Sequence, residues 1–176
     1  MSIYVEAFKK TDMTDAILVV NRKKLHVNKA LLSYHSDYFN TLFNSDFKEK
    51  SMPEIEIKDV YFEDFATMLS LINTAPLKPN ENRLEEYLKL ADRFLLPAVK
   101  YHLEQLLLTS NTDNDYKLQL SITYKLNELL EQSLKKLKYP YCYSEFKNFI
   151  AQKFFKDLPA ADQANVMNRY MDVIGY

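Results

Sequence analysis

Phe47, Lys48 and Glu49 are the residues whose types and spacing most suggest chemistry, and that chemistry is binding. They lie in FNSDFKEKSMPEIEIKDV (43–60), where one aromatic ring stands among charged neighbours. The ring either folds back into the core or stays partly exposed as an anchor for a partner. Burying a phenylalanine is worth about 1.5–3 kcal/mol, and truncating an interface anchor costs about 2 kcal/mol or more. Glu49 would accept hydrogen bonds from the partner or cap its own helix. Composition alone leaves both interpretations of the ring open.

The remaining reactive side chains do not predict a catalytic or metal site. His26, His35 and His102 each lack a second His or Cys at zinc-ligand spacing. Cys142 lies between tyrosines in an expected turn, and a catalytic thiol requires a partner base that the sequence does not identify. The only glycine is Gly175, so a glycine-rich phosphate loop is excluded. We therefore expect a protein that is no enzyme and has no catalytic residue, no metal and no cofactor.

Composition restricts the class of partner. The chain has 176 residues, of which 47% are hydrophobic, enough for one large domain or a small domain with an appended subdomain. It carries 23 basic and 24 acidic side chains, a balance that disfavours nucleic acid and anionic membranes as partners. A single cysteine excludes an internal disulfide and suits the cytoplasm or nucleus, where we expect the protein to work. No apolar window is long enough for a signal peptide or a membrane span.

The elements that position Phe47 are predicted to be a small sheet and two short helices. Residues 15–20, DAILVV, form a short β-branched apolar run that ends at the turn-former Asn21, and residues 23–27, KKLHV, alternate. Together they predict a hairpin with one buried face. Residues 28–43 predict two helices, the second beginning after Ser36 as its N-cap. The alternating residues at 54–60, EIEIKDV, predict a third strand.

From residue 62 onward the apolar spacing predicts helices. A polar stretch at 109–115, TSNTDND, is the best domain boundary. Two segments, 91–107 and 121–137, share apolar positions at matching offsets and indicate a helix pair used twice. The expected helices lie near residues 62–73, 84–95, 97–107, 126–137, 144–157 and 159–174, with Pro97 in the first turn of the third.

The N-terminal segment contains Ile3, Val5 and Phe8 at nearly alternating spacing. This spacing indicates either a strand exchanged between protomers or the end of a preceding domain, and we favour the strand.

In this order and spacing, three segments resemble the BTB/POZ domain: DAILVV…LHVNKALLSYHSDYFNTLF, then EIEIKDV, then LKLADRF. The resemblance covers about residues 14 to 108. It implies an α+β fold, in which a small three-stranded sheet is flanked by a cluster of helices and followed by an all-helical C-terminal extension. The expected organisation is an N-terminal segment at 1–14, the BTB/POZ domain at 15–108, a linker at 109–115 and BACK-like helices at 116–176.

The resemblance also implies function. Many members of the family are homodimeric substrate adaptors of cullin-3 ubiquitin ligases, and they insert a hydrophobic–x–Glu motif into the cullin. The matching residues here are Phe47, Lys48 and Glu49, so the resemblance favours the anchor interpretation. Asp15 and Lys29 match a charged pair of family dimers, for which a structural salt bridge is favoured over a ligand pocket.

Three partners follow from the resemblance: cullin-3, a second copy of the chain, and an unidentified protein client. MATH or kelch domains bind clients in relatives, and neither fits in the residues outside the match. The final helices, a partner, or a domain missing from this chain would then recruit the client. The alternative function is a homo- or hetero-oligomerisation module without a ligase role, as in transcriptional or scaffold proteins.

Overall fold

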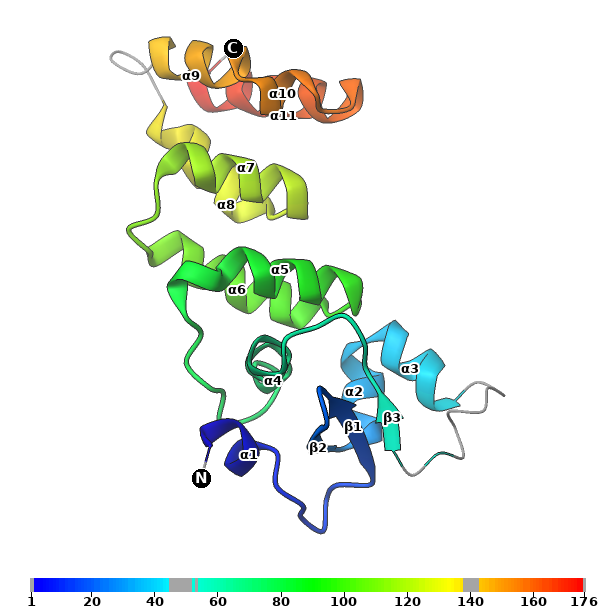
Figure 1. Ribbon diagram of the computed structural model, residues 1–176. Helices are drawn as coiled ribbons and strands as arrows, with labels where there is room; N and C mark the ends of the chain where they lie inside the picture. The colour runs from blue at the N-terminus through cyan, green and yellow to red at the C-terminus, as the bar shows by residue number, and fades with distance from the viewer. Residues whose placement is uncertain (1, 45–51, 53, 138–142, 176) are drawn as a thin grey trace. The chain divides into compact units, whose positions relative to one another are not determined.

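The computed structural model describes residues 2–44, 52, 54–137 and 143–175 (Figure 1). Its described residues pack as two compact units, Met1–Leu103 and Glu104–Tyr176. The expected small sheet with helices, followed by further helices, is confirmed. The domain boundaries drawn from the sequence, with a linker at 109–115, stay a prediction.

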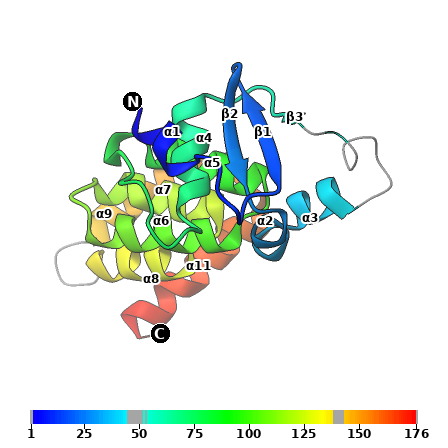
Figure 2. The same cartoon turned by 90° about the horizontal axis from the view of Figure 1, so that it is seen from below.

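The first unit contains a three-stranded sheet in the order β2-β1-β3. Strands β1 (Ala16–Val20) and β2 (Lys23–Val27) form the predicted hairpin, which Figure 2 shows side by side. Asn21 and Arg22 make its turn with φ of 48° and 65°, the left-handed values that a tight hairpin turn requires. β3 (Glu54–Glu56) pairs with β1 in parallel and is shorter than the predicted strand. Alternate residues of the sheet face the core, among them Leu18, Val20, Leu25, Val27 and Ile55.

Short helices cover the sheet. Pro97 begins its helix, as predicted, because its missing N–H costs nothing in the first turn. Asn28 caps the first of the two helices expected at 28–43, its side chain accepting a bond from Leu31 N–H. The helices are α1 (Ile3–Ala7), α2 (Lys29–His35), α3 (Asp37–Asn44), α4 (Phe62–Ser70), the 3₁₀ turn η2 (Glu81–Arg83), α5 (Leu84–Arg93) and α6 (Pro97–Thr109).

The N-terminal segment is a helix, so the expected strand at residues 3–8 is wrong. Three apolar positions at near-alternating spacing also suit one turn of helix. The segment is too short for this spacing to distinguish a strand from a helix. Phe8 is 5% exposed, and Tyr4 makes an edge contact with Phe62 of α4 at 6.1 Å between ring centroids. The carbonyl of Phe8 accepts a hydrogen bond from His26 N–H at 3.0 Å, which occupies the outer edge of β2.

A cluster of aromatic rings joins α3 to the end of α5. Phe94 lies 5.0–5.7 Å from the rings of Tyr38, Phe39 and Phe65. Beside it, Ser36 Oγ accepts from Phe39 N–H at 3.1 Å and donates to the Phe94 carbonyl at 2.6 Å. Ser36 is therefore the predicted N-cap of α3 and also a buried link to a residue distant in sequence.

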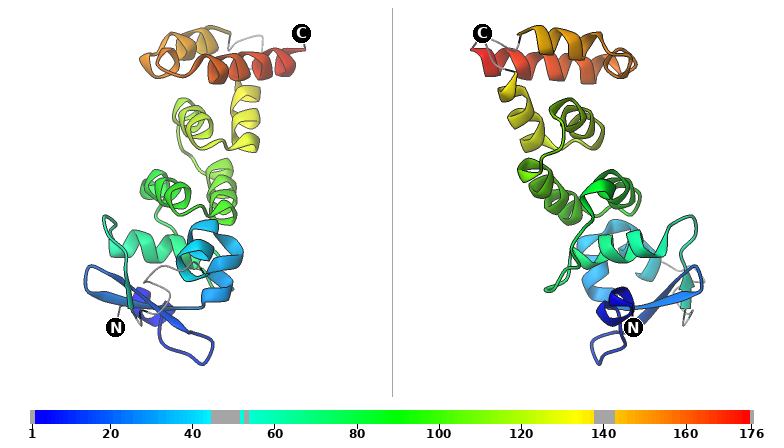
Figure 3. Two further views of the ribbon diagram at one scale, coloured as in Figure 1. Left: turned by 90° about the vertical axis from the view of Figure 1, so that its right-hand side faces the viewer. Right: turned by 60° about the vertical axis from the view of Figure 1, so that its left-hand side comes forward.

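The second unit is helical and has its own core. Leu118, Leu134 and Phe149 in this core are fully buried, and Phe146 stacks on Tyr170 at 3.6 Å. Figure 3 shows the last helix lying beside the helices that precede it. The helices are α7 (Asn114–Tyr124), α8 (Asn127–Lys136), α9 (Tyr143–Ala151), the single turn α10 (Lys153–Lys156) and α11 (Ala160–Ile174).

The repeated helix pair that the sequence indicates is present. Leu95, just after α5, and Lys125, the C-cap of α7, have φ of 49° and 57°. The residue that follows each of them donates its backbone N–H to a carbonyl of the preceding helix. Leu96 donates to Ala91 O at 2.8 Å, and Leu126 donates to Ser121 O at 2.9 Å. The two junctions thus share one left-handed turn, although neither uses glycine.

In the second unit, side chains of neighbouring helices satisfy helix ends. Glu104 Oε1 accepts from Leu129 N–H in the first turn of α8 at 2.9 Å. Lys117 Nζ donates to the Ser110 carbonyl just after α6 at 2.8 Å, and the Lys117 residue is only 2% exposed. Burial lowers the pKa of the Lys117 ammonium, with a smaller contribution from the nearby charge of Lys136.

Replacing Ser36 with alanine should remove the α3 cap and leave the buried Phe94 carbonyl without its donor. We expect Ser36→Ala to lower the free energy of unfolding by about 1–3 kcal/mol in urea titrations. Ser2→Ala is the matched control, because Ser2 occupies the N-cap of α1 but makes no side-chain capping bond there. Equal losses in the two variants would contradict this role of Ser36.

The buried Lys117 should make stability depend on alkaline pH. Its pKa is lower in the fold than in the unfolded chain, so the unfolded chain binds more protons just below pH 10.5 and stability rises with pH there. Lys117→Met should lack this gain when urea midpoints are compared between about pH 7 and pH 10. Lys147→Met, at an exposed position of α9, is the control and should follow the wild type. Identical pH slopes for wild type and Lys117→Met would show that the charge is not desolvated.

Candidate protein-binding site

The motif residues Phe47, Lys48 and Glu49 lie outside the described residues, so their placement stays a prediction. The structure does describe the elements on both sides of them. α3 ends at Asn44 and β3 begins at Glu54. The segment that carries the motif therefore connects a helix and a strand of the same unit.

The core position at the end of α3 is filled by Phe43, not by a later ring. Phe43 is 3% exposed and stacks on Phe39 at 5.9 Å, as its helical spacing predicts. The ammonium of Lys29 lies over the Phe43 ring at 5.7 Å from its centroid. Phe43 thus supplies the aromatic packing that the core interpretation assigned to Phe47.

C-terminal to the motif segment, the backbone is fixed by the pairing of β3 with β1 and by hydrogen bonds from Arg93. Leu18 and Ile55 are paired in the parallel ladder, and Ile57 N–H donates to Val19 O at 2.9 Å. The Arg93 guanidinium donates to the carbonyls of Lys58 and Asp59 at 2.9 and 3.0 Å. These charge-assisted bonds fix the turn after β3. Sequence analysis found Arg93 in the LKLADRF segment but gave it no role, since its acceptors are backbone atoms.

Asp15 and Lys29 are joined, but through a backbone atom. Asp15 Oδ1 accepts from the Lys29 backbone N–H at 2.7 Å, at the N-terminus of α2. Asn28 reinforces this corner, its side-chain nitrogen donating to Met13 O at 2.7 Å. A carboxylate at a helix N-terminus is favoured by the helix dipole. The described contact of Asp15 is therefore structural, and its predicted role in dimers stays untested.

Exposed apolar side chains gather on the N-terminal segment. Ile3, Val5 and Met13 are 63%, 41% and 75% exposed. A hollow of about 150 Å³, with a lining that includes Met13 and Leu31, lies in the same segment and beside α2. Exposed apolar residues of this kind are candidates for an interface, and the helical arrangement of Ile3 and Val5 could not be found from the alternating pattern.

Further exposed apolar and aromatic side chains lie on the same unit and were missed by sequence analysis. Tyr34 is 85% exposed at the end of α2, where its ring makes an edge contact with His35 at 5.0 Å. Leu95 and Tyr101 are 53% and 58% exposed. At sequence level these side chains are indistinguishable from core residues of their helices.

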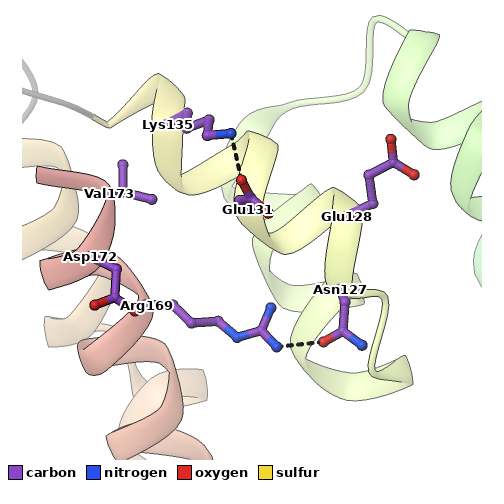
Figure 4. A pocket seen from close by; sticks show the side chains of 7 residues that line it. All are labelled: Asn127, Glu128, Glu131, Lys135, Arg169, Asp172 and Val173. Atoms are coloured by element: carbon purple, nitrogen blue, oxygen red, sulfur yellow. Dashed lines mark hydrogen bonds and ion pairs between the residues drawn. The ribbon is translucent and has the colours of Figure 1, made fainter.

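A hollow of the second unit is open and lined by charged side chains. It has a volume of about 720 Å³ and lies between α8 and α11 (Figure 4). Lys135 pairs with Glu131 at 2.5 Å, which lowers the pKa of the Glu131 carboxyl, and Arg169 donates to Asn127 Oδ1 at 2.7 Å. Glu128 accepts from Gln105 Nε2 at 2.9 Å, so most polar groups of this hollow are already engaged by neighbouring side chains.

Within the described ranges, no group of three or more His, Cys, Asp or Glu side chains could hold a metal ion. Along the same residues, no helix combines the length and apolar character that a membrane crossing needs. Cys142 lies outside the described residues.

Comparison with known proteins gives consistent matches. The family model of the BTB/POZ domain matches residues 4–111. BTB and MATH domain-containing protein 36 of Caenorhabditis elegans is 35% identical over 130 residues, which are 73% of this chain and 41% of that protein. BTB and MATH domain-containing protein 38 of the same organism is 28% identical over 166 residues, covering 94% of this chain and 42% of that protein.

Among solved structures, the BTB domain of human gigaxonin matches with 24% identity and a TM-score of 0.45, covering 53% of this chain and 77% of that one. The chain spans about two-fifths of the length of the curated relatives described above.

Proposed function

The chain belongs to the BTB/POZ family of protein-interaction modules, and from that premise we propose that it is a dimeric substrate adaptor of a cullin-3 ubiquitin ligase. Phe47 is its anchor in the cullin, and Glu49 accepts hydrogen bonds that orient it. The protein works in the cytoplasm, the nucleus or both, and it presents an unidentified client to the ligase. It transforms no substrate itself.

The observation that supports this proposal most is how the ends of the motif segment are held. α3 is fixed by Ser36 and by the packing of Phe43, and β3 is fixed by β1 and Arg93. A ring carried between two fixed ends loses less conformational freedom on binding than a ring on a free terminus. Phe43 fills the core at the end of α3, and this supports the assignment of Phe47 to the partner rather than to the core.

Dimerisation is supported by the exposed apolar residues of α1 and the segment after it. Two protomers would hold two cullin sites and two clients, which raises effective concentration without any new contact. The relatives carry a MATH domain in their names, and this chain spans about two-fifths of their length, so the client site is proposed to lie in such a domain, in the helices of the second unit, or on a partner.

The alternative is an oligomerisation module without a ligase role, which the exposed Ile3 and Val5 also favour. A folded wild-type dimer that does not bind the cullin-3 N-terminal region would establish this alternative over the adaptor.

The cullin contact is tested with Phe47→Ala combined with Glu49→Ala. We expect the double variant to bind the cullin-3 N-terminal region about thirtyfold or more weakly in pull-down and calorimetry, because an interface anchor is worth about 2 kcal/mol or more. Circular dichroism should be unchanged. Lys48→Ala is the control at the intervening position and should change affinity by less than about threefold. Undiminished capture by the double variant would remove the adaptor assignment.

The dimer is tested with Ile3→Glu combined with Val5→Glu. Two buried carboxylates per protomer are costly at an apolar interface, so light scattering should show a shift from dimer to monomer with the fold retained. Lys10→Glu adds an acidic side chain at an exposed position just after α1 and should leave the mass unchanged. A dimer that survives the double variant would place the interface elsewhere.

A further inference from the structure

Residues 74–80, TAPLKPN, connect α4 to the turn η2, and we call them the proline segment (Figure 1). From Pro76 to Asn80 the backbone forms no helix, strand or turn. A proline fixes its own φ at about −65°, and the residue before a proline is driven toward extended backbone. Pro76, Lys78 and Pro79 are restrained in this way, and Asn80 is extended too, with φ of −78° and ψ of 118°. The segment therefore favours the polyproline II helix.

Two neighbouring helices hold the proline segment in place. The Leu77 N–H donates at 3.0 Å to Oγ of Ser70, a fully buried residue at the end of α4. The Asn80 N–H donates to the Tyr87 hydroxyl of α5 at 3.4 Å. The prolines have no N–H that would need an acceptor. A partner would thus meet a segment that is already ordered.

The accessible side of the proline segment carries its prolines. A polyproline II helix has about three residues per turn, so Pro76 and Pro79 lie one turn apart on a common edge. Pro76 and Lys78 are exposed, and Pro79 is half-buried. Leu77 belongs to a different edge, is half-buried and bonds to α4 through its N–H. The segment therefore lies against its own unit through Leu77 and leaves the proline edge accessible.

The two prolines restrict how a partner can recognise this segment. A proline lacks the N–H with which a strand pairs to a sheet, so an added β-strand is excluded. The segment is not helical, so recognition in a helix-binding groove is excluded as well. The backbone-based mode that remains is recognition of polyproline II by an aromatic-lined groove. Pro76-Leu77-Lys78-Pro79 has the P-x-x-P spacing of such ligands.

We propose that the proline segment binds the aromatic groove of an SH3 domain in a partner protein. The aromatic rings of such a groove pack on the rings of Pro76 and Pro79. Lys78 places an exposed positive charge between the two prolines, so a groove flanked by carboxylates is the one that fits. The contact involves neither the motif segment nor α1, and it recruits a further partner that the cullin contact does not require.

The expected complex is weak. The P-x-x-P motif spans only about 12 Å of chain, and an interface this small falls below the roughly 1,200 Å² of stable complexes. The bonds to Ser70 and Tyr87 offset part of this weakness, because an ordered segment loses little conformational freedom on binding. We therefore expect micromolar affinity and rapid exchange, which suit NMR titration.

NMR titration of the full chain with a panel of SH3 domains tests the proposal. Domains with an acidic groove should shift the amide signals of the proline segment, and Pro76→Ala combined with Pro79→Ala should weaken binding by about tenfold or more. Pro159→Ala, which removes an exposed proline beside α11, is the control and should change affinity by less than about twofold. Binding by no SH3 domain of the panel, or equal affinity of wild type and the double variant, would overturn the proposal.

Two further substitutions separate recognition from mere stiffening of the loop. Lys78→Glu keeps both prolines, so it should leave the free energy of unfolding unchanged but weaken binding to acidic grooves by about fivefold or more. Thr74→Ala, at an exposed position outside the P-x-x-P motif, should bind as the wild type does. A loss of stability without a loss of affinity in the double proline variant would show that the prolines only stiffen the loop. Phe47→Ala with Glu49→Ala should leave SH3 binding intact, so a failed cullin contact does not affect this result.

Discussion

The packing of Phe94 and the Ser36 hydroxyl beside it is the contact on which the first unit depends. α3, α4 and the end of α5 meet at this ring, and Ser36 is hydrogen-bonded to both α3 and the Phe94 carbonyl. α3, the element that precedes the motif segment, is therefore held by a contact more than fifty residues away in sequence. Arg93, the residue before Phe94, donates to the backbone carbonyls just after β3, the element that follows the motif segment. Two adjacent residues of the LKLADRF segment therefore position both flanks of Phe47.

Two helix–helix junctions of the chain repeat one geometry. Leu95 and Lys125 adopt the same left-handed turn between successive helices, and the amide that follows each makes the same backward bond. A left-handed residue without glycine carries strain, so the turn must be held by the helices on either side. The buried bonds of Glu104 and Lys117 provide such support in the second unit. Polar side chains there satisfy the ends of other helices rather than forming a ligand site.

The described residues of this chain form surfaces suited to binding. The described residues show paired charges, an open hollow and exposed apolar residues on α1, α2 and α11, and these features suit recognition of other macromolecules. The proposed function assigns one surface to the cullin and another, on α1, to a second copy of the chain. Separate surfaces allow one chain to bind several partners at once, which is the property that an adaptor or scaffold requires.

The sequence by itself determined the hairpin, the two-helix segment with its Ser36 cap, the repeated helix pair and the burial of Phe43, because each depends on local periodicity or on a capping residue. It also predicted the family, through motifs in a fixed order. Only the tertiary structure decided that residues 3–7 form a helix, that Arg93 binds the backbone after β3, and that Asp15 meets a backbone N–H. It also separated exposed Tyr34 and Met171 from core residues of the same type. The physical reason is that these features depend on which parts of the fold contact one another. The local sequence around each residue does not specify such long-range contacts.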